Sequence, residues 1–218
     1  AKDNPNCPEE NGPDLDYSAS SISIDLGYRD ILVAGQKSGV VYGLDPDNGE
    51  ILWSNALSGG GTQGGVHFGM ASEGETVYVP LHDMEQTNDG KIYEDLKPGV
   101  HSVDAKTGEL LWSKINPNKC GDIKFCDPGV SAALTAIPGA VIAGHGDGKI
   151  RVYNKNDGEI LWSFNALKEF KSVSGVPALG GGFSGPGSAI RNGYMAMNSG
   201  YGIYYHMPGN ALLLFSVD

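Results

Sequence analysis

The three cysteines are the residues whose chemistry follows most directly from their spacing. Cys120 and Cys126 lie six positions apart in one polar segment, close enough for a disulfide that closes a loop. Cys7 is then left over, and an odd cysteine indicates a free thiol or an intermolecular disulfide. Disulfides would place the protein in an oxidising compartment, secreted or periplasmic. Three unpaired thiols in a cytosolic protein are the alternative. The sequence contains no Cys-x-x-Cys-His, so no c-type haem attachment is expected.

Two other features that often carry chemistry give weaker signals. Four of the five histidines fall in separate segments without the spacing of metal ligands, so no zinc site is expected from His82, His101, His145 and His206. The glycine-rich runs at 59–65 and 180–187 contain no Gly-Lys-Ser or Gly-Lys-Thr, so they are not expected to cradle phosphate. We interpret them as loops that enter the innermost strands, where backbones crowd together.

One segment is repeated along the chain and forms the framework in which the cysteines, histidines and glycine-rich runs lie. Each copy reads as a strand, a tight turn and a second strand, and the second strand ends in one of the three tryptophans of the chain. A short polar residue opens the turn and can hydrogen-bond the backbone ahead of it, and a glycine closes it, where a positive φ costs little. The complete copies are Gly39–Trp53, Gly99–Trp112 and Gly148–Trp162, and a fourth at Gly209–Asp218 stops at its turn.

The period of this repeat indicates the fold class. The tryptophans Trp53, Trp112 and Trp162 are 59 and 50 residues apart, close to the roughly 40–50 residues of a four-stranded propeller blade. No segment shows a convincing 3.6-residue apolar period, so an all-β β-propeller is expected. The predicted divisions are a lead-in loop at 1–20, blades at 21–55, 56–114 and 115–164, and an incomplete blade at 165–218. The first strands of the last three blades are expected at 65–71, 131–137 and 183–190.

Composition and charge restrict the partners. The formal net charge is −11, which argues against a phosphate-binding surface and therefore against nucleic acid. No apolar run approaches the roughly 18 residues of a membrane span. The fourth copy lacks its last strand, and soluble propellers avoid open edges by closing the ring. We therefore expect about four blades of an eight-bladed ring, completed by another chain or by an upstream segment. A free four-bladed ring is the alternative.

The repeat resembles the tryptophan-docking motif of the pyrroloquinoline-quinone (PQQ) dehydrogenase propellers, in which the tryptophan of one blade lies against the next. Other segments resemble the polyvinyl-alcohol-dehydrogenase-like branch of that family: 12–20, 30–45, 64–69, 134–139, 199–202 and 207–218. The match runs in order along nearly the whole chain and implies the carboxy-terminal half of an eight-bladed enzyme. It also implies PQQ and Ca²⁺ as cofactors, with the metal ligands in the other half rather than in this chain.

The resemblance assigns two charged residues to the site. Asp16 lies in a Leu-Asp-Tyr segment that matches the family's Trp-Asp-Tyr, where the aspartate is a general base for the substrate hydroxyl. Lys37 lies in a Gln-Lys-Ser-Gly segment that matches the family's Arg/Lys-Asn-Gly, where the cation reaches the quinone carbonyl oxygens. Without this context, Asp16 would be one of 26 acidic residues, helping to cap a turn, and Lys37 would be a solvated lysine.

His67 and Phe68 lie where the chain departs from the family pattern. The segment Gly64–Gly69 aligns with Gly-Gly-x-Asn-Trp or Gly-Gly-x-Glu-Trp, near the cofactor. Neutral imidazole donates or accepts a hydrogen bond, so the resemblance assigns His67 to PQQ or to the substrate. A hydrogen-bonded histidine at the inner end of a strand is the alternative. Phe68 keeps the apolar wall of the family's tryptophan but lacks its N–H.

Two functions of different classes follow. The first is a PQQ- and calcium-dependent alcohol dehydrogenase acting on a small or polymeric alcohol. Its partner would be the amino-terminal half of the propeller, with Cys7 as the candidate for an interchain disulfide. The second is a redox-inactive secreted propeller that binds or supports other molecules, which the departures at Leu15, His67 and Phe68 favour. Preservation of the acid and the lysine favours the enzyme. An outer-membrane-type assembly factor, also a propeller, would not explain those two residues.

Overall fold

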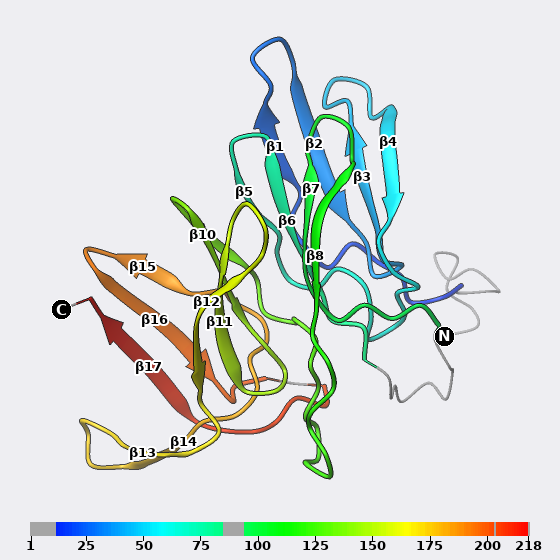
Figure 1. Cartoon of the computed structure of the whole chain (residues 1–218). Helices are drawn as coiled ribbons and strands as arrows, with labels where there is room; N and C mark the ends of the chain where they lie inside the picture. Colours follow the sequence, from blue (N-terminus) through cyan, green and yellow to red (C-terminus); the bar gives the residue numbers. More distant parts are fainter. Residues whose placement is uncertain (1–11, 85–93, 203, 218) are drawn as a thin grey trace, which may run out of the picture.

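All the regular secondary structure of the chain is β-strand in the computed structural model, which describes residues 12–84, 94–202 and 204–217 (Figure 1). The predicted all-β fold is therefore confirmed. Figure 1 shows the sheets following one another in chain order, from the blue and cyan strands to the orange and red ones. Within the described segments, no helix is long and apolar enough to cross a membrane.

Three antiparallel four-stranded sheets and one three-stranded sheet make up the architecture. The first sheet contains β1 (Ile22–Asp25), β2 (Asp30–Gly35), β3 (Val40–Leu44) and β4 (Ile51–Ala56). The second contains β5 (Ala71–Glu73), β6 (Thr76–Leu81), β7 (Gly99–Asp104) and β8 (Leu110–Ile115). The third contains β9 (Thr135–Ile137), β10 (Ala140–Gly144), β11 (Lys149–Asn154) and β12 (Ile160–Asn165). The fourth contains β15 (Ala189–Arg191), β16 (Tyr194–Ser199) and β17 (Ala211–Ser216). A hairpin of β13 (Glu169–Lys171) and β14 (Pro177–Leu179) precedes it.

Neighbouring sheets pack face to face, with an apolar core between each pair. Strand β6 shows how one sheet serves two cores. Val77 and Val79 belong to the core shared with the first sheet, whereas Tyr78 belongs to the core shared with the third. Strand β10 repeats this arrangement with Val141 and Ile142. Successive side chains of a strand point to opposite faces, so an apolar run buries both faces of these sheets.

Two tryptophans join neighbouring sheets through the turns of the repeat. The indole Nε1–H of Trp53 donates to the carbonyl oxygen of Ala105 at 2.9 Å, and that of Trp112 donates to the carbonyl oxygen of Lys155 at 2.8 Å. Each acceptor lies in the turn of the following sheet. The glycine closing each turn has a positive φ, and a Cβ there would overlap the indole ring; these residues are Gly108 and Gly158.

Trp162 was expected to dock in the same way, and its surroundings differ. Its residue is 41% exposed, against 9% for Trp112. Its ring lies against Phe164 and Phe215 rather than against a turn glycine.

The first strands of the later sheets are shorter than expected. Residues 65–70 lie outside the named strands apart from one bridge between Val66 and Leu81, and β5 begins only at Ala71. Likewise, β9 begins at Thr135 and β15 at Ala189. Glycines at 64, 65 and 69 interrupt the first of these segments, and Gly65 has a left-handed φ of 61° that a strand does not accommodate. The expected strands at 65–71, 131–137 and 183–190 are therefore mostly irregular backbone. The hairpin of β13 and β14 was not predicted.

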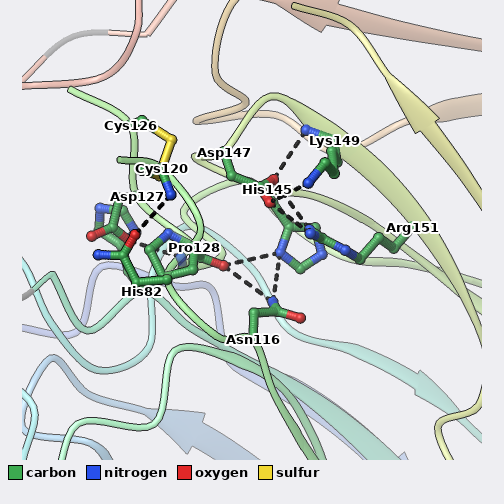
Figure 2. Close-up of a disulfide and its surroundings, with 12 residues drawn as sticks. His82, Asn116, Cys120, Cys126, Asp127, Pro128, His145, Asp147, Lys149 and Arg151 are labelled. Carbon is green, nitrogen blue, oxygen red and sulfur yellow. Dashed lines mark hydrogen bonds and ion pairs between the residues drawn. A yellow bond between two sulfur atoms is a disulfide. The ribbon is translucent and has the colours of Figure 1, made fainter. Parts of the chain in front are cut away.

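The predicted disulfide between Cys120 and Cys126 is present, with the two Cα atoms 5.6 Å apart (Figure 2). Buried polar contacts hold the base of the loop that it closes. The Nδ2 atom of Asn116 donates to the carbonyl oxygen of Pro128 at 3.1 Å and to Nδ1 of His145 at 2.9 Å. The disulfide therefore closes a loop whose two ends are already anchored to the third sheet. Cys7, the candidate for an interchain disulfide, lies outside the described residues.

Candidate functional site

A cavity of about 390 Å³ lies where the lead-in segment meets the loops of three sheets. Its walls come from the lead-in, the end of β2, the glycine-rich loop before β5 and the segment between β16 and β17. All four residues assigned to catalysis or cofactor binding from the sequence line it. The full lining is Asp14, Asp16, Ser18, Lys37, Thr62, Gln63, His67, Phe68, Tyr204 and His206.

Lys37 is the centre of the charged part of this wall. Its Nζ lies 2.7 Å from Oδ1 of Asp16 and 3.2 Å from Oδ1 of Asp14. The backbone N–H of Lys37 also donates to the carbonyl oxygen of Asp16 at 3.1 Å. Both main chain and side chains therefore hold the lead-in segment against the end of β2. The lysine side chain is 14% exposed and that of Asp16 is 63% exposed, so the carboxylate stays accessible from the cavity.

This ion pair fixes the charges of both groups. The hydrogen bond from Lys37 is the main reason why the pKa of Asp16 lies below its ordinary value, against the opposing effect of burial. Burial acts against the charge of Lys37, but the hydrogen bonds and attraction of Asp16 and Asp14 outweigh it and raise its pKa. At neutral pH the site therefore holds an ionised carboxylate, able to accept a proton, beside an ammonium group, able to stabilise negative charge.

The glycine-rich loop at 59–65 packs against the backbone of Lys37. The N–H of Gly61 donates to the carbonyl oxygen of Lys37 at 2.9 Å. A Cβ on Gly60 or Gly65 would overlap that same carbonyl oxygen. The N–H of Gly65 in turn donates to Oδ1 of the buried Asp83 at 2.6 Å. The run at 59–65 is thus a loop in close backbone contact with Lys37, in line with the crowding expected for a glycine-rich loop, and it holds the main chain of that residue in place.

His67 forms the deepest polar part of the wall. It is 4% exposed, and neither of its ring nitrogens has a hydrogen-bond partner among the described residues. Burial, together with Lys37 and His206 nearby, lowers its pKa to about 4, so the imidazole is neutral at neutral pH. A buried polar group without a partner costs about 1–3 kcal/mol. Among the described residues, no group satisfies the ring of His67 in the way that the alternative of a hydrogen-bonded histidine at a strand end requires.

Two further histidines, not predicted for the site, extend this wall. The ring centroid of His82 lies 5.1 Å from that of His67 and 5.2 Å from that of His206, on which it stacks. His82 is fully buried, and burial holds its pKa well below the ordinary value. His206 lines the cavity itself. The three residues are far apart in the sequence, so no spacing signal indicated that they meet.

Two aromatic residues of the cavity have a left-handed backbone. The φ angles are 43° at Phe68 and 56° at Tyr204, and both side chains line the cavity. Such a backbone is unusual for a bulky side chain, and strain of this kind concentrates at ligand sites. Tyr204 was also missed from the sequence, because nothing in its local pattern predicts a positive φ for a tyrosine.

The remaining histidines are structural. Nδ1 of His101 lies 2.8 Å from the hydroxyl of Ser113, and its Nε2 lies 2.9 Å from the carbonyl oxygen of Lys97. Nε2 of His145 lies 3.0 Å from the hydroxyl of Tyr153. Both rings are buried and hydrogen-bonded within their own sheets or to adjacent loops. The residues that the structure describes contain no group of three or more His, Cys, Asp or Glu able to hold a metal ion.

The fold is a β-propeller in which two tryptophans dock on the turns of the sheets that follow them, beside a cavity lined by residues from the lead-in and three sheets. The model of the PQQ_2 family, described as outer membrane protein assembly factor BamB, matches residues 37–184. The chain belongs to this family.

Two curated relatives agree with the resemblance stated from the sequence. The chain is 41% identical over 227 residues to a polyvinylalcohol dehydrogenase of Pseudomonas sp. It is 35% identical over 232 residues to a polyvinylalcohol dehydrogenase of Sphingopyxis sp. (strain 113P3). The alignments cover 98% and 100% of this chain but 34% and 35% of the relatives. The predicted similarity to polyvinyl-alcohol dehydrogenases is confirmed, and the chain spans about a third of the length of these relatives.

A solved structure confirms the fold. The europium-containing methanol dehydrogenase superposes with a TM-score of 0.59 at 16% identity, over 92% of this chain and 41% of that one. At this identity the similarity concerns the fold, and it agrees with the predicted β-propeller.

Proposed function

We propose that this chain is part of a PQQ- and calcium-dependent alcohol dehydrogenase that oxidises a primary or secondary alcohol of the polyvinyl-alcohol type. The observation that carries this proposal is the Asp16 carboxylate, 2.7 Å from Lys37 Nζ, in the wall of a cavity that also contains His67. A base, a cation and a neutral hydrogen-bonding group around one cavity are the groups that alcohol oxidation on a bound quinone needs. The similarity to two polyvinylalcohol dehydrogenases supports the substrate class.

The cavity residues fit a flat cofactor rich in oxygen atoms. Lys37 has an ammonium group, and His67 has two buried ring nitrogens without a partner in the described protein. Quinone and carboxylate oxygens accept hydrogen bonds from the ammonium group of Lys37 and from the single N–H of the neutral His67 ring. Phe68 and Tyr204 supply aromatic surface. In this proposal Lys37, His67 and Phe68 hold PQQ, which supplies the acceptor for a hydride or its equivalent.

The chain's own residues would then manage the proton and the charge. Asp16 is ionised at neutral pH, with a pKa that Lys37 holds below the ordinary 3.8, so its carboxylate accepts the hydroxyl proton of the alcohol. Accepting that proton neutralises Asp16, which weakens its attraction for Lys37 Nζ. The lysine charge then becomes available to negative charge developing elsewhere in the cavity. His67 is neutral and adds no second positive charge beside Lys37.

The rest of the enzyme is assigned to polypeptide outside the 218 residues. In this proposal the ranges 21–55, 56–114, 115–164 and 165–218 are blades of an eight-bladed ring, with 1–20 as the lead-in. The calcium ligands and the remaining blades lie in the amino-terminal half, to which Cys7 is the candidate disulfide link. The Cys120–Cys126 disulfide supports a secreted or periplasmic location, because such bonds persist in oxidising compartments.

An absorption spectrum of the assembled protein tests this proposal. We expect PQQ, added with Ca²⁺, to bind and give a quinone band that bleaches when poly(vinyl alcohol) or a simple secondary alcohol is added. If the assembled ring does not bind PQQ at any calcium concentration, the proposed enzyme activity is contradicted. A non-reducing gel of the same sample tests the disulfide, because a larger band should fall to the size of this chain on reduction.

The second candidate is a redox-inactive propeller with a binding or structural role. The description of the matching family model, an outer membrane protein assembly factor, favours it, as do the replacements at Leu15 and Phe68. It predicts an assembled protein with normal stability that neither binds PQQ nor oxidises alcohols.

A further inference from the structure

Aromatic residues with a left-handed backbone gather on one side of the cavity. In the described segments, the non-glycine residues with a positive φ are Phe68, Asp83, Asp95, Phe125, Asn192, Tyr204 and Tyr205. Asp and Asn adopt this backbone more readily than other residues, whereas a bulky side chain is strained there. Phe68 and Tyr204 line the cavity. Tyr205 follows Tyr204, and its ring centroid lies 5.8 Å from that of Phe125. Backbone strain concentrates where ligands bind, so this side of the cavity is a candidate ligand surface.

Phe125 is held in this position by the disulfide loop. It directly precedes Cys126, which is bonded to Cys120 (Figure 2). The N–H of Cys126 also donates to the carbonyl oxygen of Ile123 at 3.2 Å, which closes a turn around Phe125. The planes of the Phe125 and Tyr205 rings are inclined by 61°, an edge contact that aromatic pairs favour. Phe125 therefore fixes the orientation of Tyr205.

The chain on the other side of Tyr205 is anchored as well. His206, the next residue, is 8% exposed and stacks on the buried His82, with 5.2 Å between the ring centroids. Beside this anchor, Tyr204 is 66% exposed and Tyr205 is 45% exposed. These two residues, which we call the tyrosine pair, begin in the cavity wall at Tyr204 and continue outside it at Tyr205. The pair is thus an exposed aromatic surface on a firmly held segment.

The chemistry of the tyrosine pair fits one kind of ligand. Each tyrosine offers an apolar ring face for methylene groups and a hydroxyl that donates and accepts hydrogen bonds. A flexible chain in which methylene groups alternate with hydroxyl-bearing carbons presents both kinds of group along its length. Such a chain, with its reacting unit beside Asp16, can leave the cavity past Tyr204 and extend along Tyr205. A single small alcohol beside Asp16 ends inside the cavity and does not reach Tyr205.

We propose that the tyrosine pair binds the part of a chain-like polyalcohol that extends outside the cavity, and that Phe125 positions Tyr205 for this contact. The inference rests on the proposed function, and it assigns the preference for long over short alcohols to residues outside the catalytic group. Because Tyr205 does not line the cavity, its contribution concerns binding of the chain and not the reaction at Asp16.

The test compares a polymer with a single unit in variants of the full-length, assembled protein. Tyr205→Ala removes the outer ring of the pair without changing a residue that lines the cavity. Tyr28→Ala is the matched control: Tyr28 is 64% exposed but precedes β2, whereas Lys37 follows that strand at its other end. The measurements are kcat and KM for poly(vinyl alcohol) and for isopropanol, which supplies one secondary alcohol without a chain.

We expect Tyr205→Ala to raise KM for poly(vinyl alcohol) about five- to ten-fold with little change in kcat, and to leave both constants for isopropanol unchanged. Phe125→Ala should raise the polymer KM in the same way, and Phe125→Tyr, which keeps the ring, should restore it. Tyr28→Ala should change neither substrate's constants. An equal effect on both alcohols, or an unchanged polymer KM in Tyr205→Ala, would overturn the proposal.

Direct binding separates this inference from the proposed reaction. The dissociation constant of poly(vinyl alcohol) is measured by titration calorimetry on the assembled protein without PQQ. If the protein oxidises no alcohol, but Tyr205→Ala weakens polymer binding about five- to ten-fold and Tyr28→Ala does not, the tyrosine pair is supported and only the enzyme activity fails. If Tyr205→Ala leaves polymer binding unchanged and lowers the stability of the assembled protein, the pair packs against the rest of the protein and the inference is wrong.

Discussion

Asp16 and Lys37 share a hydrogen-bonded ion pair of 2.7 Å, although one lies in the lead-in segment and the other follows β2. A backbone hydrogen bond runs between the same two residues, from the N–H of Lys37 to the carbonyl oxygen of Asp16. The pair is thus positioned independently of its charges. A charge-removing substitution at either residue should therefore change the chemistry of the site more than its structure.

Replacement of the proposed base should separate catalysis from binding. Asp16→Asn keeps the size of the side chain but removes its proton affinity, so we expect kcat of the assembled enzyme to fall about 10²–10⁴-fold. PQQ affinity should change much less. Asp14→Asn is the matched control, because Asp14 contacts Lys37 at 3.2 Å without the assigned role. Steady-state kinetics and PQQ titration check both, and equal losses in the two variants would contradict the assignment.

Lys37 should set the acid limb of the pH–rate profile. Its hydrogen bond is the main cause of the lowered pKa of Asp16, so Lys37→Ala should raise that pKa toward the ordinary value of 3.8. A base must be ionised to act, so the acid limb of kcat/KM should move to higher pH in this variant. Lys37→Arg keeps the charge and should keep the limb low. If the limb does not move in Lys37→Ala, Asp16 is not the group that titrates.

Replacement of a turn glycine should cost more stability where a tryptophan docks on the turn than where no side chain lies against it. Gly49 and Gly108 have nearly the same φ, 76° and 74°, but open space surrounds a Cβ at Gly49, whereas a Cβ at Gly108 overlaps the Trp53 ring. Gly49→Ala should therefore cost about 1 kcal/mol, from the backbone alone. Gly108→Ala should lower the free energy of unfolding by a further ~1–3 kcal/mol, because the Trp53 ring must shift. Urea unfolding of the two variants measures the difference, and equal costs would show that the ring contact contributes nothing.

Acidification should destabilise the fold through its buried neutral histidines. Burial holds the pKa of His67 at about 4 and that of His145 at about 3, below the ordinary 6.5. The unfolded chain therefore takes up protons first, so this contribution is complete above pH 6.5 and is lost as the pH falls toward the folded-state values. His67→Phe should remove up to about 3 kcal/mol of this loss of stability on acidification. The variant should lose less stability than the parent between about pH 7 and about pH 4.5.

Unfolding free energies measured by urea at several pH values check this prediction. His101→Phe serves as a comparison, because His101 is hydrogen-bonded to Ser113 and its removal also breaks that contact. A His67→Phe variant with the same pH dependence as the parent would mean that His67 is not held neutral in the folded protein.

The sequence predicted those parts of the fold that depend on local chemistry. A positive φ at a turn requires glycine, and an indole requires a partner for its N–H, so the positions of Gly108 and Trp53 indicated turn, strand and repeat together. The cavity residues Asp16 and Lys37 were found only through the resemblance. Neither residue has a local pattern that distinguishes it from other charged residues of the chain.

Contacts between distant segments were not predictable in this way. The rings of His67, His82 and His206 meet because loops of the second and fourth sheets converge, and no periodicity in the sequence indicates that these loops lie together. The segment at 65–71, before and into β5, was predicted as the first strand of its blade. Its glycines instead allow close contact with the carbonyl of Lys37, a requirement that depends on the folded neighbour.

Asp83 connects the segment between β6 and β7 to the glycine-rich loop beside Lys37. One carboxylate oxygen accepts the N–H of Gly65 at 2.6 Å, and the other accepts the N–H of Lys97 at 2.8 Å. Gly65 in turn lies against the carbonyl of Lys37. The Asp83 carboxylate thus binds both ends of the arrangement. A different loop between Asp83 and Lys97 would leave Lys37 in place as long as the hydrogen bonds from Gly65 and Lys97 remain. The length and sequence of the segment between Asp83 and Lys97 can therefore change without moving Lys37.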